Sequence, residues 1–188
     1  PSRKLVYDFN RVPIKPLQVE PKENVVLFLN GFKDWRNLHL LIQAMPSVIA
    51  KQPDVFFQIV GAADDRMVEY YKNQCVALGI DQSKYDIQCW TNQPDQFYEK
   101  AKIFVLPADL IFCNFSLLEA MERGLVPIVA NVEDADKIVQ HQYNGILCER
   151  NSEQISLEIL HLLSDPDTFQ KMSVNARQSI IEHYNDIN

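Results

Sequence analysis

The sequence predicts an α/β protein with a doubly wound, Rossmann-like fold: a parallel sheet of about six strands with helices on both faces. Short apolar runs rich in β-branched residues alternate with longer segments whose apolar residues recur at helical spacing. Gly61, Gly79 and Gly124 stand at the ends of such segments. Strands separated by helices favour a parallel sheet with right-handed crossovers. With 188 residues, the chain suits one large domain better than two.

The first half of the chain is predicted to supply three strands. The run NVVLFLNG, residues 24–31, is typical of a strand buried on both faces. A helix follows from Asn37, and Pro46 interrupts its apolar pattern. The alternation continues with a strand at 55–62, a helix at 64–79, a strand at 85–90 and a short helix at 93–100.

The second half continues the alternation and ends in helices. The last helix has Asp165 as its N-cap and Pro166 at its first position, and it runs to about Tyr184. Before it we expect a strand at 102–108, a helix at 116–124, a strand at 126–131, a short helix at 134–141, a turn at Asn144-Gly145, a strand at 146–149 and a helix opening at Asn151 or Ser152.

The first 23 residues differ from the rest, because they carry four prolines and no sustained period. We interpret residues 1–23 as a linker or interdomain lead-in and residues 24–188 as one domain. The chain begins at Pro1 rather than at Met, which suggests a piece of a longer protein. In doubly wound folds ligands bind where the strand order reverses, commonly between the first and fourth strands. Those strands end here in NGFKDWRN and LPADLIFCN.

Composition excludes several classes of function. The net charge is −7 and no Lys/Arg run forms a basic stripe, so nucleic acid is not expected as a partner. No apolar run approaches the roughly 20 residues that span a bilayer, and we expect a cytoplasmic protein. The four cysteines lack the spacing of a zinc site and are interpreted as reduced. The four histidines are scattered, and neither GxGxxG nor a Walker loop follows the first strand.

The segment from Asn30 to Asn37 is a candidate anion site. A buried strand ends at Gly31, and Lys33 and Arg36 precede the next helix. Free N–H groups and the helix dipole favour an anion at such a position, and the two cations would reinforce it. A solvated loop with Lys33 facing water explains the same residues equally well.

Glu119 is the second candidate, because it lies within the apolar stretch NFSLLEAMERGLVPIVAN. A carboxylate beside a buried helix face needs partners, and its two oxygens suit the vicinal hydroxyls of a ribose. The alternative is a helix-surface glutamate that pairs with Arg123 or with water.

These segments together resemble the C-terminal, donor-binding half of GT-B glycosyltransferases of family 4, or group 1, over residues 24–184. The best stretch, FVLPADLIFCNFSLLEAMERGLVPIVAN, is similar to the family's LPS turn, E-x7-E segment, EAM helix and following strand. AMPSVIAKQPDVFFQIVGA, NGILCE and HLLSDPDTFQKMSVNAR resemble further family segments in the same order.

The resemblance implies roles for particular residues. Glu119 would hold the ribose hydroxyls of a nucleotide-diphosphate sugar, and the N–H groups near Asn114 and Phe115 would face its diphosphate. Arg36, with Lys33 two residues after Gly31, would neutralise the leaving diphosphate. The segment 89–92 would border the base, with Trp90 stacking on it and Thr91 beside it. The sequence names no catalytic residue, no metal ligand and no cofactor apart from the sugar nucleotide itself.

Four departures from the family pattern fall in the same crevice. The first Glu of E-x7-E falls on Ile111, for which Asp109 is an imperfect substitute, and the family's Arg after the strand-ending glycine falls on Phe32. A glycine pair becomes Glu133-Asp134, and a following Glu becomes Lys137. The added acids oppose phosphate binding.

Two main functions remain open at this stage. The first is a retaining transferase of hexose whose acceptor site, and any membrane contact, lies in a missing N-terminal Rossmann-like domain, so that the isolated domain is inactive. The second is a degenerate relative that binds no donor and acts as an interaction or scaffold module, with Phe32 and Phe112 filling the crevice. A nucleotide-sugar epimerase is a third, less favoured, interpretation.

Overall fold

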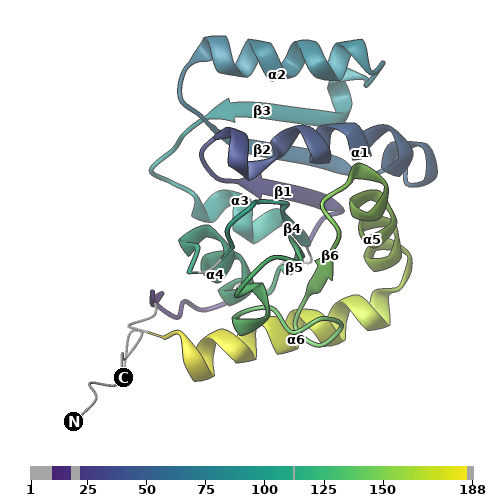
Figure 1. Cartoon of the computed structure of the whole chain (residues 1–188). Coiled ribbons are helices and arrows are strands. Elements are labelled where there is room, and N and C mark those ends of the chain that lie inside the picture. Colours follow the sequence, from purple (N-terminus) through teal and green to yellow (C-terminus); the bar gives the residue numbers. More distant parts are fainter. Residues whose placement is uncertain (1–9, 18–21, 112, 186–188) are drawn as a thin grey trace.

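The computed structural model describes residues 10–17, 22–111 and 113–185. Its centre is a six-stranded, all-parallel sheet in the order β3-β2-β1-β4-β5-β6 (Figure 1). The predicted doubly wound fold with about six strands is therefore confirmed, as is the reversal of strand order between the first and fourth strands. The strands are β1 (Val25–Leu29), β2 (Phe56–Ala62), β3 (Tyr85–Cys89), β4 (Ile103–Leu106), β5 (Val126–Ala130) and β6 (Ile146–Cys148).

Helices pack in pairs around the sheet. The helix α1 contacts α5, and α4 contacts α6. Because the chain leaves β1 toward one edge of the sheet and β4 toward the other, right-handed crossovers put α1 and α4 on opposite faces. The helices are α1 (Leu38–Lys51), α2 (Asp65–Ala77), α3 (Asp95–Lys100), α4 (Phe115–Glu122), α5 (Ser152–Ser164) and α6 (Pro166–His183), with short 3₁₀ turns at Asp34–Arg36, Gln82–Lys84 and Ala135–Lys137.

Apolar strands account for the core. All four residues of β4 and all five of β5 are buried, as the continuous apolar runs in the sequence predict for strands covered on both faces.

No helix in the described part of the chain combines the length and apolar character needed to cross a membrane.

Four helices begin at a side-chain cap. Asp64, Asn114, Asn151 and Asp165 each accept a hydrogen bond from the backbone N–H three residues later, at 2.8–3.1 Å. Such caps satisfy one of the N–H groups that lack a partner within the helix. The predicted start of the last helix, Asp165 followed by Pro166, is confirmed.

One expected helix is shorter than predicted. Residues 134–141 form only the 3₁₀ turn Ala135–Lys137, which Asp134 enters in the left-handed conformation with φ 64°. The side chain of Asn144 explains the difference, because it accepts from the Gln140 N–H at 2.7 Å and donates to the Ile138 carbonyl at 3.1 Å. Backbone groups that would extend a helix are thereby bonded to a side chain instead.

The described part of the lead-in packs against the domain. Val12 is buried and its N–H donates to the Tyr184 carbonyl at 2.9 Å. The backbone N–H of Lys15 donates to Glu122 Oε1 at 2.8 Å, and its ammonium contacts both oxygens of Asp95. Residues 10–17 therefore lie along α4, α6 and α3 as a strap.

Candidate functional site

A pocket lies where the strand order reverses, between the carboxyl ends of β1 and β4. Its volume is about 280 Å³. This is at the lower end of the range of about 300 to 1,000 Å³ that is typical of ligand sites. Among the described residues, its lining consists of Asn30, Arg36, Leu110, Cys113, Asn114, Phe115 and Ser116.

Asn114 joins the two sides of this pocket. Its Oδ1 accepts from the Leu117 N–H at 3.1 Å, which caps α4, and from Asn30 Nδ2 at the end of β1 at 3.2 Å. The first N–H groups of a helix have no acceptor within the helix, and the helix dipole adds positive potential there. The N-terminus of α4 therefore opens into the pocket as an anion-binding position.

Arg36 supplies a cation on the other side of the pocket. Its guanidinium carbon lies 3.9 Å from the centroid of the Trp35 ring, and Nη1 donates to the Leu110 carbonyl at 3.2 Å. Its Nε is buried and has no hydrogen-bond partner among the described residues. Burial lowers the pKa of Arg36, but arginine stays charged in proteins. Arg36 thus adds a positive charge to the pocket that the N-terminus of α4 also lines.

The loop that carries Arg36 is fastened to the loop after β4. Asn37 has left-handed backbone geometry, with φ 53°, which asparagine tolerates better than most residues. Its Nδ2 donates to the Pro107 carbonyl at 3.0 Å and to Asp109 Oδ1 at 2.7 Å. The Asp109 N–H donates to the Trp35 carbonyl at 2.8 Å. These bonds fix the position of Arg36 relative to β4.

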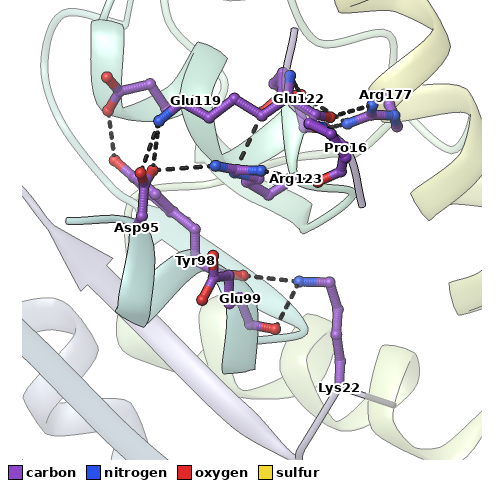
Figure 2. Close-up of polar contacts among 10 residues, drawn as sticks. Pro16, Lys22, Asp95, Tyr98, Glu99, Glu119, Glu122, Arg123 and Arg177 are labelled. Carbon is purple, nitrogen blue, oxygen red and sulfur yellow. Dashed lines mark hydrogen bonds and ion pairs between the residues drawn. The ribbon is translucent and has the colours of Figure 1, made fainter. Parts of the chain in front are cut away.

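Glu119 lies on α4, one helical turn after Ser116, and is half-buried. Its Oε2 accepts from the Tyr98 hydroxyl at 2.9 Å (Figure 2). Burial raises the pKa of Glu119, and the Tyr98 hydrogen bond and the charge of Lys15 oppose that rise. Its Oε1 has no hydrogen bond to any residue in the described ranges. The carboxylate is therefore held at one oxygen, and the pocket lining given above does not include it.

The remaining predicted site residues do not line the pocket. Lys33 is exposed, and Gly31 precedes it in the same loop. Trp90 is 71% exposed after β3, and Thr91 Oγ1 accepts from the Gln93 N–H at 3.1 Å. Asp109 is engaged by Asn37 and by Arg150. The structure thus brings Arg36, Asn114 and Phe115 together at one pocket. It leaves Trp90 and Thr91 at the end of β3, which β2 separates from β1.

Sequence reasoning gave no role to three pocket residues and to one buried partner. Leu110, Cys113 and Ser116 line the pocket together with Asn30, which began the candidate anion segment. The places of the three residues between the end of β4 and the first turn of α4 were the available signal. Tyr98, the partner of Glu119, lies in a short helix 21 residues away and gave no signal in the sequence.

The acidic departures from the family pattern are partly neutralised. Lys137 Nζ lies 2.7 Å from Asp134 Oδ1, so two of the unusual residues pair with each other. Arg150 likewise pairs with Asp109. Glu133 remains exposed. Among the described residues, no three His, Cys, Asp or Glu side chains gather in a way that could hold a metal ion.

Comparison with known proteins decides the kinship of the chain. A sequence profile described as "Glycosyl transferases group 1" matches residues 12–179. The chain belongs to this family. The predicted resemblance to group 1 GT-B glycosyltransferases is thereby confirmed.

Curated relatives of this group 1 chain are considerably longer than it. An uncharacterized glycosyltransferase of Haemophilus influenzae is 28% identical over 158 residues, which make up 83% of this chain and 44% of that protein. The UDP-Gal:alpha-D-GlcNAc-diphosphoundecaprenol alpha-1,3-galactosyltransferase of Escherichia coli is 28% identical over 141 residues, or 71% of this chain and 34% of that protein. The chain spans less than half of the length of these relatives.

Solved structures of glycosyltransferases share the fold. A mutant of TarM from S. aureus superposes with a TM-score of 0.80 at 20% identity, covering 93% of this chain and 36% of that one. HepE of Anabaena, in complex with UDP and glucose, gives 0.77 at 20% identity, covering 87% and 45%. The C-terminal domain of LpcC from Francisella tularensis gives 0.76 at 21% identity and covers 88% of both chains. The match to this last structure agrees with a C-terminal GT-B domain.

Proposed function

We propose that this group 1 chain is the domain of a retaining glycosyltransferase that binds a nucleotide-diphosphate sugar, with the diphosphate in the pocket between Arg36 and the N-terminus of α4. One observation carries the proposal: Arg36 lines the same pocket as the N-terminus of α4, which Asn114 caps at the reversal point of the sheet. Such a combination of N–H donors, dipole and guanidinium recognises phosphate oxygens.

The proposed chemistry follows from charge that develops during transfer. When the bond between the sugar and the diphosphate breaks, negative charge accumulates on the leaving diphosphate. Donors that are already oriented toward that charge lower the barrier, because they need little reorganisation. Arg36 is oriented by Trp35 and the Leu110 carbonyl, and Lys33 in the same exposed loop adds a second cation. The free Oε1 of Glu119 would accept a hydrogen bond from the ribose.

The first donor to test is a UDP-sugar. The Escherichia coli relative is named as a transferase of galactose from UDP-galactose, and the HepE structure contains UDP and glucose. Hexosyl transfer with retention is proposed on the same grounds. Trp90, exposed at the end of β3, would stack on the base.

The acceptor is expected to bind outside this chain. Because the chain spans less than half of its curated relatives, a second Rossmann-like domain would supply the acceptor site, and any contact with a membrane surface. The domain alone is then expected to bind donor weakly and to turn over nothing. We place the protein in the cytoplasm as part of the same proposal, and we propose no cofactor.

A non-binding scaffold is the second candidate, because Ile111 replaces a carboxylate of the family pattern and is fully buried. Asp109, its imperfect substitute, is occupied by Arg150 and Asn37. The same hypothesis expects Phe32 in the crevice. Phe32 instead packs edge-on against Phe28 and Tyr71 inside the domain, and Phe112 lies outside the described residues.

Isothermal calorimetry of the chain with UDP, GDP and ADP separates the two candidates. We expect heat from UDP with a Kd on the order of 1 mM, and no heat from any of the three at millimolar concentration would refute donor binding. Arg36→Gln is expected to weaken UDP binding by about tenfold, because a charge-assisted bond is lost. Arg66→Gln is the matched control, since the Arg66 side chain is 93% exposed and pairs with Asp64 outside the pocket.

A further inference from the structure

Tyr98 occupies an unusual position for a residue of a six-residue helix. It is 1% exposed, yet its hydroxyl reaches Oε2 of Glu119 on α4 at 2.9 Å (Figure 2). Ser116, one turn before Glu119 on the same helix, lines the pocket. The phenol thus holds a carboxylate that lies one helical turn from a pocket residue.

The fold does not need this arrangement merely to bury a tyrosine. Tyr85, at the start of β3, is 5% exposed, and its hydroxyl is buried without a hydrogen-bond partner among the described residues. A buried phenol without a partner is therefore tolerated elsewhere in the same domain. The Tyr98 hydroxyl, in contrast, donates a hydrogen bond to Oε2 of the half-buried Glu119. Oε1 of Glu119 has no hydrogen bond within the described part of the chain.

The strap and the neighbouring helices hold Tyr98 itself in place. Lys15 Nζ lies 2.7 Å from Asp95, three residues earlier on α3, and Arg123 Nη2 lies 3.2 Å from the same carboxylate. Lys22 Nζ donates to the backbone carbonyls of Tyr98 at 2.8 Å and of Ala101 at 2.9 Å. The helix α3 is thus held at both ends, so the position of the Tyr98 hydroxyl relative to Glu119 is constrained.

We propose that Tyr98 is a positioning residue of the nucleotide site: it holds Oε2 of Glu119 so that Oε1 stays available to a ribose hydroxyl. This inference rests on the donor binding proposed above. A carboxylate that is fixed before the ligand arrives loses less conformational entropy on binding than a freely rotating one.

Electrostatics support the same role. Burial raises the pKa of Glu119, and the Tyr98 hydrogen bond lowers it. The other charged groups that face Glu119 are Lys15 and Arg123, which lower its pKa, and Asp95, which raises it. Removal of the hydroxyl should therefore raise the pKa of Glu119 further and shift the loss of nucleotide binding on acidification to higher pH.

The test compares two tyrosine variants of the chain with two nucleotides by calorimetry. The variants are Tyr98→Phe and the matched control Tyr85→Phe, and the nucleotides are UDP and 2′,3′-dideoxy-UDP. We expect Tyr98→Phe to weaken UDP binding by about tenfold, in line with a hydrogen bond to a charged group. Binding of the dideoxy nucleotide should change less than twofold, and Tyr85→Phe should change neither. Repeating the UDP titrations between pH 5 and pH 8 should place the acidic loss of affinity at higher pH in Tyr98→Phe.

The outcomes keep the two proposals apart. If the unaltered chain binds none of the nucleotides, donor binding itself fails. If it binds UDP and Tyr98→Phe binds UDP equally well, the positioning role is refuted while donor binding stands. Equal losses for UDP and the dideoxy nucleotide would also refute it, because they would indicate general damage to the fold. An unaltered chain that binds both nucleotides equally would show that Glu119 contacts no ribose hydroxyl, and would overturn the inference.

Discussion

Arg177 Nη1 on α6 lies 2.7 Å from Oε1 of Glu122 on α4, and the Glu122 side chain is almost fully buried. The Nε of Arg123 lies 3.3 Å from the other oxygen, and the backbone N–H of Lys15 donates to Oε1. Two guanidinium groups and the strap thus converge on one carboxylate (Figure 2). The N-terminus of α4 forms the pocket, and this cluster anchors its C-terminus.

Glu122→Gln should destabilise the domain by about 3 kcal/mol, because the partly buried Arg177 loses its counter-charge and the buried Arg123 keeps only Asp95. Urea unfolding monitored by circular dichroism measures the change. Glu69→Gln is the control, since Glu69 and Lys72 form an exposed pair at 3.9 Å that should contribute well under about 1 kcal/mol. Equal effects of the two variants would contradict the view that the Glu122 cluster fastens α4.

Gly61→Ala should destabilise the domain by about 3 kcal/mol or more. A Cβ at Gly61 would lie 1.9 Å from the backbone oxygen of Asn30, and the residue has φ +135°. Because Asn30 lines the pocket, UDP binding should weaken as well. Gly79→Ala is the matched control: its φ is +70°, but nothing lies within 4 Å of its Cβ, so only about 1 kcal/mol is expected. Thermal unfolding of both variants measures the difference in stability, and titration with UDP measures the difference in binding. A Gly61→Ala chain as stable as the Gly79→Ala chain would show that β2 can move away from Asn30.

Much of the fold could be predicted from sequence because its signals are local. The buried runs in β1, β4 and β5 and the caps Asn151 and Asp165 depend on residues within a few positions of each other. The expected helix at 134–141 is reduced to Ala135–Lys137 because Asn144 takes over backbone bonds that would extend it, and a competing side chain has no periodic signature in the sequence.

The site was less predictable, since its decisive contacts join distant segments. The strand ends in the sequence placed Arg36 and Asn114 near the reversal point of the sheet, and both residues line the pocket there. The engagement of Asp109 by Arg150 and of Glu119 by Tyr98 spans 41 and 21 residues, and neither follows from spacing along one element. Which residues line a pocket depends on side-chain directions that only the packed structure defines.

Ile111→Glu, which restores the family's carboxylate in sequence, should destabilise the domain by about 3 kcal/mol or more. Ile111 is fully buried in the core, and a lone carboxylate there would lose its hydration without gaining a counter-ion. Ile111→Leu should cost less than about 1.5 kcal/mol. Chemical unfolding compares the two, and UDP calorimetry on the same samples completes the test. A stable Ile111→Glu variant with tighter UDP binding would show that residue 111 faces the pocket in solution.

The ammonium group of Lys22 should make stability depend on alkaline pH. Burial, reinforced by Arg123, lowers the pKa of Lys22 from 10.5 to about 8, although Glu99 acts in the opposite direction. Between about pH 8 and pH 10.5 the unfolded chain therefore holds a proton that the folded chain has released, so the free energy of unfolding rises with pH in that window. Below pH 8 both states are protonated and the contribution of Lys22 to the free energy of unfolding is constant.

The test compares the unaltered chain with two lysine variants. Relative to Lys22→Met, the free energy of unfolding of the unaltered chain should rise between pH 8 and pH 10.5. Lys51→Met, at an exposed position at the end of α1, should show the same pH dependence as the unaltered chain. Urea unfolding at intervals of half a pH unit measures the difference. If the difference in the free energy of unfolding between the unaltered chain and Lys22→Met did not change with pH, the hydrogen bonds from Lys22 to the carbonyls of Tyr98 and Ala101 would offset the effect of burial on the pKa of Lys22.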